Sequence, residues 1–415
     1  MRAPTPTQEL LRLGFTDARR AQRLLEEPAL TDVVERAAAT GAPLPEALAA
    51  TADPDQALLT LVRLLEAWQA ADGAARDPAA VAVAGAGVPG PGAPDDGDST
   101  DGAADDGHPT IGSPDEGDPT VGALDDGAPR YAVDLPSVLT NDGGHRRRLL
   151  AVLGASTALG DMLVARPGDA ALLADEVTEG VLDLTAADER ERALRAVGAD
   201  PGAEVPVATV TGTAGVTALR RCYRRRLLEV AAADLVAPDH LAVFPAVAAA
   251  LSDLAAAALE AALAVARADL ADHGRGVRLA IIGMGKTGGR ELNYISDVDV
   301  VYAAAPAGGL TEAEAVAEAT RLAGAVARNV SGVAGDEPPL WPLDANLRPE
   351  GKDGPLVRTV ASHRAYYERW AHTWEFQALL KARPIAGDAE LGAQYRAAVE
   401  PFVWSAVERE NFVED

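Results

Sequence analysis

Residues 277–302 decide the fold and read VRLAIIGMGKTGGRELNYISDVDVVY. An apolar run over residues 277–282 leads directly into the glycine-rich segment 283–289. A second apolar run follows closely and carries Asp297 and Asp299 at alternate positions. Short apolar runs bounded by glycine are typical of strands, so we predict two strands joined by a glycine-rich turn.

Two familiar phosphate-binding loops match this segment only in part. Gly283, Gly285 and Gly288 spell the G-x-G-x-x-G pattern of dinucleotide-binding folds. That pattern also requires a crossover helix before the next acid-bearing strand, and none fits in the gap. A Walker A loop requires a glycine where Ala280 stands. Neither loop is favoured.

The carboxylates give a more specific pattern. Side chains two apart on a strand share a face, so Asp297 and Asp299 should point together. Such like charges are unfavourable unless a cation lies between them, and Mg²⁺ or Mn²⁺ suits their oxygens. Asp344, within LWPLDANLRP at 340–349, is the expected third carboxylate. With a glycine-rich turn that can approach a triphosphate, the pattern predicts nucleotidyl or phosphoryl transfer assisted by two metals.

Two cations lie near these acids in the sequence and are candidates for phosphate contact. Arg348 and Lys352 follow Asp344 closely. Arginine and lysine neutralise phosphate charge, but Arg348 and Lys352 fit solvated surface positions equally well.

Composition excludes several classes of function. The chain has 37 basic and 63 acidic residues, a net charge of −26, which repels nucleic acid and anionic membrane surfaces. A single cysteine, Cys222, excludes a disulfide framework and a multi-cysteine zinc site. The Ala-rich stretch 251–270 carries four charged residues, too many for a membrane span. With no visible signal peptide, we expect a cytoplasmic, soluble protein that binds neither nucleic acid nor membrane.

We predict an α+β fold with a small mixed sheet of nucleotidyltransferase type embedded in a largely helical chain. The expected segments are an N-terminal helical segment (1–78), an acidic Gly/Pro-rich insertion (79–130), a helical region (131–275), the nucleotidyltransferase core (276–350) and a C-terminal helical segment (351–415). The last segment ends within what looks like a continuing helix.

The insertion carries 11 Gly and 7 Pro in 52 residues and a ten-residue repeat around Asp-Asp-Gly. A disordered linker is favoured over a calcium-binding repeat, because little in it can be buried and no Glu closes a twelve-residue loop.

Two other clusters are interpreted as structural. Five arginines fall within residues 220–226. We expect them to form a solvated helix face that neutralises acids elsewhere, rather than a grip on an anionic partner. Five aromatic residues lie within 366–376 at largely helical spacing. A core stripe is favoured there over an adenine-stacking platform.

Residues 283–299, GMGKTGGRELNYISDVD, resemble the signature of the glutamine synthetase adenylyltransferase/adenylyl-removing enzyme family. Further similar segments are 344–351 (DANLRPEG), 374–383 (WEFQALLKAR), the arginine-rich stretch 219–235 and residues 149–156. The resemblance covers most of the chain from about residue 146 to residue 415. The insertion at 79–130 departs from the family pattern.

The resemblance implies an activity. In that family a full-length chain carries two nucleotidyltransferase domains. The N-terminal one removes AMP from a tyrosine of glutamine synthetase by phosphorolysis and releases ADP, and the C-terminal one attaches AMP from ATP. This chain has one motif block, so the resemblance implies the N-terminal, adenylyl-removing half of a multifunctional enzyme of nitrogen metabolism, as a fragment or a shorter gene product. The direction of reaction rests on position in the family's chain alone.

The resemblance also implies roles for particular residues. Asp297, Asp299 and Asp344 would hold Mg²⁺, with Mn²⁺ as the alternative. The other candidates are Gly288, Gly289 and Ser296, which would shape the phosphate pocket, and Lys286, Arg348 and Lys352, which would contact phosphate. The substrates would be phosphate with ADP as product, or ATP, and the partners glutamine synthetase and a nitrogen-signalling regulatory protein.

Three alternatives stay open. The chain could carry out ATP-dependent adenylyl transfer to glutamine synthetase. It could be a non-catalytic regulatory module that binds glutamine synthetase. It could also be a nucleotidyltransferase that acts on a small molecule or another protein.

Overall fold

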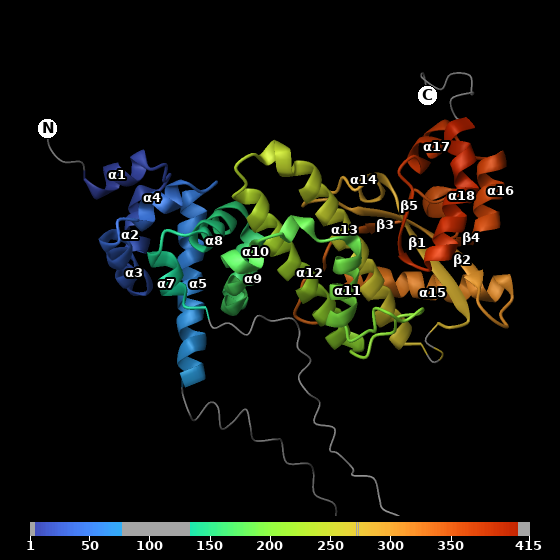
Figure 1. Ribbon diagram of the computed structural model, residues 1–415, viewed down its shortest axis with the longest axis horizontal. Helices are drawn as coiled ribbons and strands as arrows, with labels where there is room; N and C mark the ends of the chain where they lie inside the picture. Colours follow the sequence, from blue (N-terminus) through green and yellow to red (C-terminus); the bar gives the residue numbers. More distant parts are fainter. Residues whose placement is uncertain (1–4, 77–132, 271, 273, 406–415) are drawn as a thin grey trace, which may run out of the picture.

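The computed structural model describes residues 5–76, 133–270, 272 and 274–405. An N-terminal group of helices and a C-terminal part built around a sheet lie at opposite ends of the molecule (Figure 1). Two long helices, α12 (Gly212–Leu235) and α13 (His240–Ala268), lie between them. The predicted insertion at 79–130 lies outside the described residues.

The N-terminal helices share one hydrophobic core with helices that follow the insertion. Leu58, Leu61 and Leu65 are buried with Leu149 and Leu153. The elements of this part are α1 (Pro6–Arg12), α2 (Ala18–Leu25), α3 (Pro28–Ala39), α4 (Leu44–Ala49), α5 (Pro54–Arg76), α7 (Leu135–Thr140), α8 (Gly144–Ala155), α9 (Thr157–Ala165), η1 (Pro167–Leu173) and α10 (Asp175–Thr178). Segments on both sides of residues 79–130 therefore bury a common surface.

The C-terminal part is built on a small mixed sheet. Strand β1 (Val277–Gly283) pairs antiparallel with β2 (Val298–Pro306) and with β5 (Arg383–Gly387), whereas β3 (Leu343–Asp344) and β4 (Val357–Thr359) pair parallel with β2. The segment that links β1 to β2, residues 284–297, contains one helix, the four-residue α14 (Gly285–Gly288). The antiparallel pairing agrees with the rejection of a dinucleotide-binding crossover.

Helices cover both faces of this sheet. Alternate residues of β1 and β2, among them Ile281 and Val300, pack in one core with α13 and α15 (Glu312–Ser331). The intervening residues, among them Ile282 and Val301, pack with the C-terminal helices. The remaining elements are η2 (Val181–Asp183), α11 (Ala186–Ala196), η3 (Gly351–Asp353), α16 (Val360–Arg369), α17 (Thr373–Leu379) and α18 (Ala389–Ser405). The α+β prediction, a small mixed sheet in a helical chain, is confirmed.

Helix α13 is the central core helix. It is long and apolar enough to cross a membrane by length and composition, yet 61% of its most apolar window is buried inside the protein. Core helices of folded domains share these properties. Its charged residues are buried with partners: Asp253 binds Arg290, Glu260 binds Arg190, and Arg267 donates to the Pro206 carbonyl.

The expectation of a solvated arginine face on α12 is wrong. Arg220 and Arg226 are completely buried, and Arg225 is 5% exposed. At roughly 100° per residue the five arginines cover more than one side of the helix, so a single wet face cannot hold them. Arg226 lies 2.5 Å from Glu189 and 3.2 Å from Glu229, and it also donates to the Val181 carbonyl.

Other arginines of α12 bind carbonyl and carboxylate groups of residues 329–337. Arg220 donates to the carbonyls of Asn329, Gly332, Ala334 and Glu337. The buried carboxylate of Glu337 accepts from three arginines, namely Arg166, Arg221 and Arg224. These arginines join α12 to the segment before β3, so their role is internal cross-linking.

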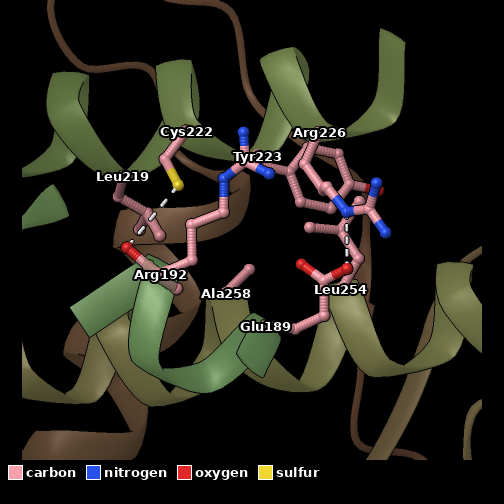
Figure 2. A pocket seen from close by; sticks show the side chains of 9 residues that line it. Glu189, Arg192, Leu219, Cys222, Tyr223, Arg226, Leu254 and Ala258 are labelled. Atoms are coloured by element: carbon pink, nitrogen blue, oxygen red, sulfur yellow. Dashed lines mark hydrogen bonds and ion pairs between the residues drawn. The ribbon is translucent and has the colours of Figure 1, made fainter. Parts of the chain in front are cut away.

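Figure 2 shows a small cavity beside the Arg226–Glu189 ion pair, between α11, α12 and α13. Its volume is about 10 Å³, close to what one water molecule needs. Cys222 lines it and is buried, and burial raises the pKa of its thiol to about 11. The only cysteine is therefore a protonated core side chain, since a reactive cysteine requires the thiolate.

The aromatic residues at 366–376 do not form one stripe. Tyr367 and Phe376 are buried in the core on the sheet face opposite α13 and α15, as the core-stripe interpretation requires. Trp370 and Trp374 are 71% and 49% exposed. The break between α16 and α17 at residues 370–372 turns the two tryptophans out of that core.

We predict that Arg226→Met lowers the free energy of unfolding by roughly 3–5 kcal/mol, because it leaves the buried Glu189 without its cation. Urea denaturation measures the loss. The double variant Arg226→Met/Glu189→Met should recover most of it, because apolar replacement of both partners removes the uncompensated charge. Equal stability of the single variant and the wild type would contradict this account of α12.

Candidate active site

The ends of two adjacent strands bring the predicted carboxylates together. Asp299 is the second residue of β2, Asp297 directly precedes the strand, and Asp344 ends β3. The parallel pairing of β2 with β3 sets Asp299 opposite Asp344. One carboxylate oxygen from each of the three residues lies within 4.8 Å of the others. The geometry therefore forms an acidic cluster from two segments more than 40 residues apart.

The electrostatics of this cluster favour a cation. Burial raises the pKa of Asp299, and the charges of Asp297 and Asp344 raise it further, while Lys286 acts in the opposite direction. Three carboxylates supply hard oxygen ligands of the kind that Mg²⁺ and Mn²⁺ prefer. The residues present thus fit a divalent metal.

The glycine-rich turn packs directly against the acids. Gly285 has φ +51°, and a Cβ atom there would lie 2.6 Å from Oδ2 of Asp299. At Gly288 a Cβ atom would lie 1.9 Å from the Lys381 carbonyl oxygen. The Met284 amide donates to the Asp299 carbonyl at 2.9 Å. Glycine is required at 285 and 288 because backbone and carboxylate occupy the space of a side chain.

The remaining predicted site residues have different surroundings. The Lys286 ammonium donates to Oδ1 of Asn293 at 3.0 Å, and the Ser296 hydroxyl lies 3.3 Å from Oδ1 of Asp297. Gly289 faces the aliphatic part of the Lys381 side chain. Ser296 and Gly289 are half-buried, whereas Lys286 is exposed.

The two cations after Asp344 differ from each other. The Arg348 guanidinium donates to the carbonyls of Ala345, Lys352 and Gly354, so it braces the loop that follows β3. Lys352 is exposed on η3. Arg348 thus has a structural task in addition to the phosphate contact expected of it, and Lys352 is the more accessible of the two.

Sequence reasoning missed several residues that support the turn. Asn293 accepts from Lys286 and donates to the Ile295 carbonyl. Lys381 forms an ion pair with Glu291 at 2.5 Å, and Arg383 donates to the carbonyls of Thr287 and Gly288. Lys381 and Arg383 lie within the quoted segment 374–383, but no spacing rule connects them with a turn about 95 residues earlier.

Comparisons with known proteins identify relatives of the chain. The family model described as glutamate-ammonia ligase adenylyltransferase matches residues 146–398. A bifunctional glutamine synthetase adenylyltransferase/adenylyl-removing enzyme of Streptomyces avermitilis is 44% identical over 411 residues, which is 98% of this chain and 32% of the relative. A protein of the same name from Leifsonia xyli subsp. xyli is 52% identical over 279 residues, 65% of this chain and 27% of the relative. The chain thus spans between about a quarter and a third of the length of these curated relatives.

We predict that Asp299→Asn removes metal-dependent stabilisation. Without metal its thermal midpoint should equal or exceed that of the wild type, because the change removes one of three clustered like charges. Added Mg²⁺ or Mn²⁺ should raise the wild-type midpoint by several degrees, since a ligand at 100 times its dissociation constant stabilises by about 2.7 kcal/mol. The exposed Asp269→Asn is the matched control. An equal metal-dependent rise in Asp299→Asn and wild type would place the metal elsewhere.

Proposed function

The chain belongs to the glutamate-ammonia ligase adenylyltransferase family, and on that premise we propose that it removes AMP from an adenylylated tyrosine of glutamine synthetase by phosphorolysis. The single observation that carries the proposal is the cluster of Asp297, Asp299 and Asp344 beside a glycine turn, within the matched region. The direction of reaction is taken from the resemblance to the adenylyl-removing half, because an acidic site serves both directions.

The proposed reaction is a displacement at the adenylyl phosphorus. An oxygen of inorganic phosphate forms the new O–P bond while the bond to the tyrosine oxygen breaks, so ADP leaves and the phenolate takes up a proton. Displacement of this kind depends on positioning and on charge stabilisation. A divalent metal held by the three carboxylates would supply positive charge to the attacking and leaving oxygens.

The protein's own residues would position the phosphates. Gly288 and Gly289 would shape the phosphate pocket by letting the turn pack closely against Lys381, and Ser296 borders Asp297. Lys286 is held by Asn293 on the same segment as the glycines, at a distance from which its charge acts on Asp299. Lys286, Arg348 and Lys352 would offset the negative charge of the attacking phosphate and the departing ADP.

The names of the relatives support glutamine synthetase as the proposed protein substrate. The rest of the proposed setting comes from the family resemblance: control of nitrogen assimilation in the cytoplasm, with a nitrogen-signalling protein as a regulatory partner. ATP-dependent adenylyl transfer would use the same residues in reverse. A purely binding module is disfavoured, because clustered carboxylates are costly to retain without a cation.

The test is ADP release from adenylylated glutamine synthetase in the presence of Mg²⁺ and phosphate. We predict phosphate-dependent ADP that falls roughly a hundredfold or more in Asp297→Asn/Asp299→Asn, because several kcal/mol of charge stabilisation would be lost. Asp269→Asn should keep the wild-type rate.

A parallel reaction supplies ATP and unmodified glutamine synthetase. AMP transfer in that reaction, without ADP release in the first, would reverse the proposed direction. Binding of glutamine synthetase without either reaction would support the regulatory module instead.

A further inference from the structure

The glycine turn is held by two residues that sequence reasoning did not place at the site. We infer that Arg383 and Asp253 are positioning residues, which hold the glycine turn 285–289, with Lys286 on it, in place beside the acids for phosphate binding. The inference rests on the proposed function for what the turn binds, but not for how the turn is held.

Arg383 contacts the turn through two donors on one edge of its guanidinium group. It opens β5 directly opposite Gly283 of β1. Its Nε donates to the Gly288 carbonyl and its Nη2 to the Thr287 carbonyl, each at 3.0 Å. The Gly288 and Gly289 amides donate back to the Met284 and Gly285 carbonyls at 2.9 and 3.1 Å, so the two bonds from Arg383 fix a closed helical turn at its last carbonyls. A lysine has no planar fork and cannot hold two carbonyls in the same way.

Asp253 places a charge behind Arg383. It lies on the central helix α13 and is only 2% exposed. Its Oδ2 binds Nη2 of Arg290 at 2.5 Å, and its Oδ1 lies 3.9 Å from Nη1 of Arg383. That Oδ1 accepts no hydrogen bond from the described residues. A buried carboxylate is costly unless it is paired. Here the Asp253 charge is paired with Arg290, which follows the turn, and lies near Arg383, which binds the turn from β5.

The segment after the turn is anchored to the same helix. Arg290 has φ +56°, an uncommon conformation for a side chain other than glycine. Two residues later, the Leu292 amide donates to the Ser252 hydroxyl at 3.1 Å. Helix α13 therefore binds residues 290–292, and Arg383 binds residues 287–288. The chain continues from this anchored segment to Ser296 and Asp297. A shift of this network would move the turn and the acids together.

The surroundings of the network make it testable by substitution. Asp253, Arg290 and Arg383 line an open cavity of about 590 Å³ between α13, the turn and residues 182–186 at the end of η2 and the start of α11, with Ala246, Ala249 and Ala250 on its wall. A shortened side chain at 383 therefore faces solvent-filled space rather than a closed core. A small guanidinium ion can reach the vacated position.

We expect Arg383→Lys and Asp253→Asn to raise the KM for inorganic phosphate on the order of tenfold, the scale of one lost hydrogen bond to a charged group, with kcat changed much less. Arg383→Ala should show the same defect and regain affinity for phosphate when guanidinium chloride is added at millimolar concentration. The matched control is Arg278→Lys, because Arg278 lies on β1, the strand that pairs with β5, and binds Asp388 and Glu390, away from the turn.

A measurement that needs no turnover separates this inference from the proposed function. Hydrogen–deuterium exchange at peptides covering residues 284–292 should be faster in Arg383→Lys and Asp253→Asn than in wild type and Arg278→Lys. Wild-type exchange in both variants would overturn the inference whether or not ADP is released. So would an unchanged KM in an active enzyme, or a loss of activity that follows thermal stability alone. Absence of wild-type activity together with altered exchange would count against the proposed function only.

Discussion

The mutual repulsion of three carboxylates is the constraint on which the rest of this structure depends. Asp297, Asp299 and Asp344 approach within 4.8 Å, and burial makes the charge on Asp299 still less favourable. A flexible surface would let the acids move apart. Here β2 fixes Asp299, the parallel pairing with β3 fixes Asp344, and the antiparallel β1 presses the glycine turn against the same carboxylates. The sheet is small, but it holds a charge arrangement that a divalent metal would complete.

Much of the helical scaffold is joined by buried charge. Helices α12 and α13 are rich in alanine, which buries little apolar surface per residue, and long arginine side chains span the distances between elements. Arg226, Arg220 and Arg225 bind carboxylates or carbonyls of five other segments, namely η1, η2, α11, α15 and the segment before β3. Removal of one partner from such a pair leaves an uncompensated buried charge, so these pairs define the arrangement of the helices more than they add to stability.

Buried charge also joins elements at the end of the sheet that carries the acidic cluster. Arg383 and Arg290 connect the glycine turn with Asp253 on the core helix, as Arg220 and Arg226 connect α12 with its neighbours. Charged side chains thus connect the proposed phosphate pocket to the core helix α13. A turn made of glycines has little stiffness of its own, and this network supplies it.

The sequence by itself determined the α+β class, the strand–turn–strand unit and the acids, because these features depend on local alternation, glycine and residue type within a short segment. It also indicated the family, through motifs that the matched region at 146–398 contains. It did not predict that α12 would be buried, since a run of arginines looks the same whether its partners are water or carboxylates far along the chain. The tertiary structure alone decided the pairing of Asp299 with Asp344, the brace of Arg383 on Thr287 and Gly288, and the burial of Asp253, because each joins residues about 40 to 130 positions apart that only strand pairing and helix packing bring into contact.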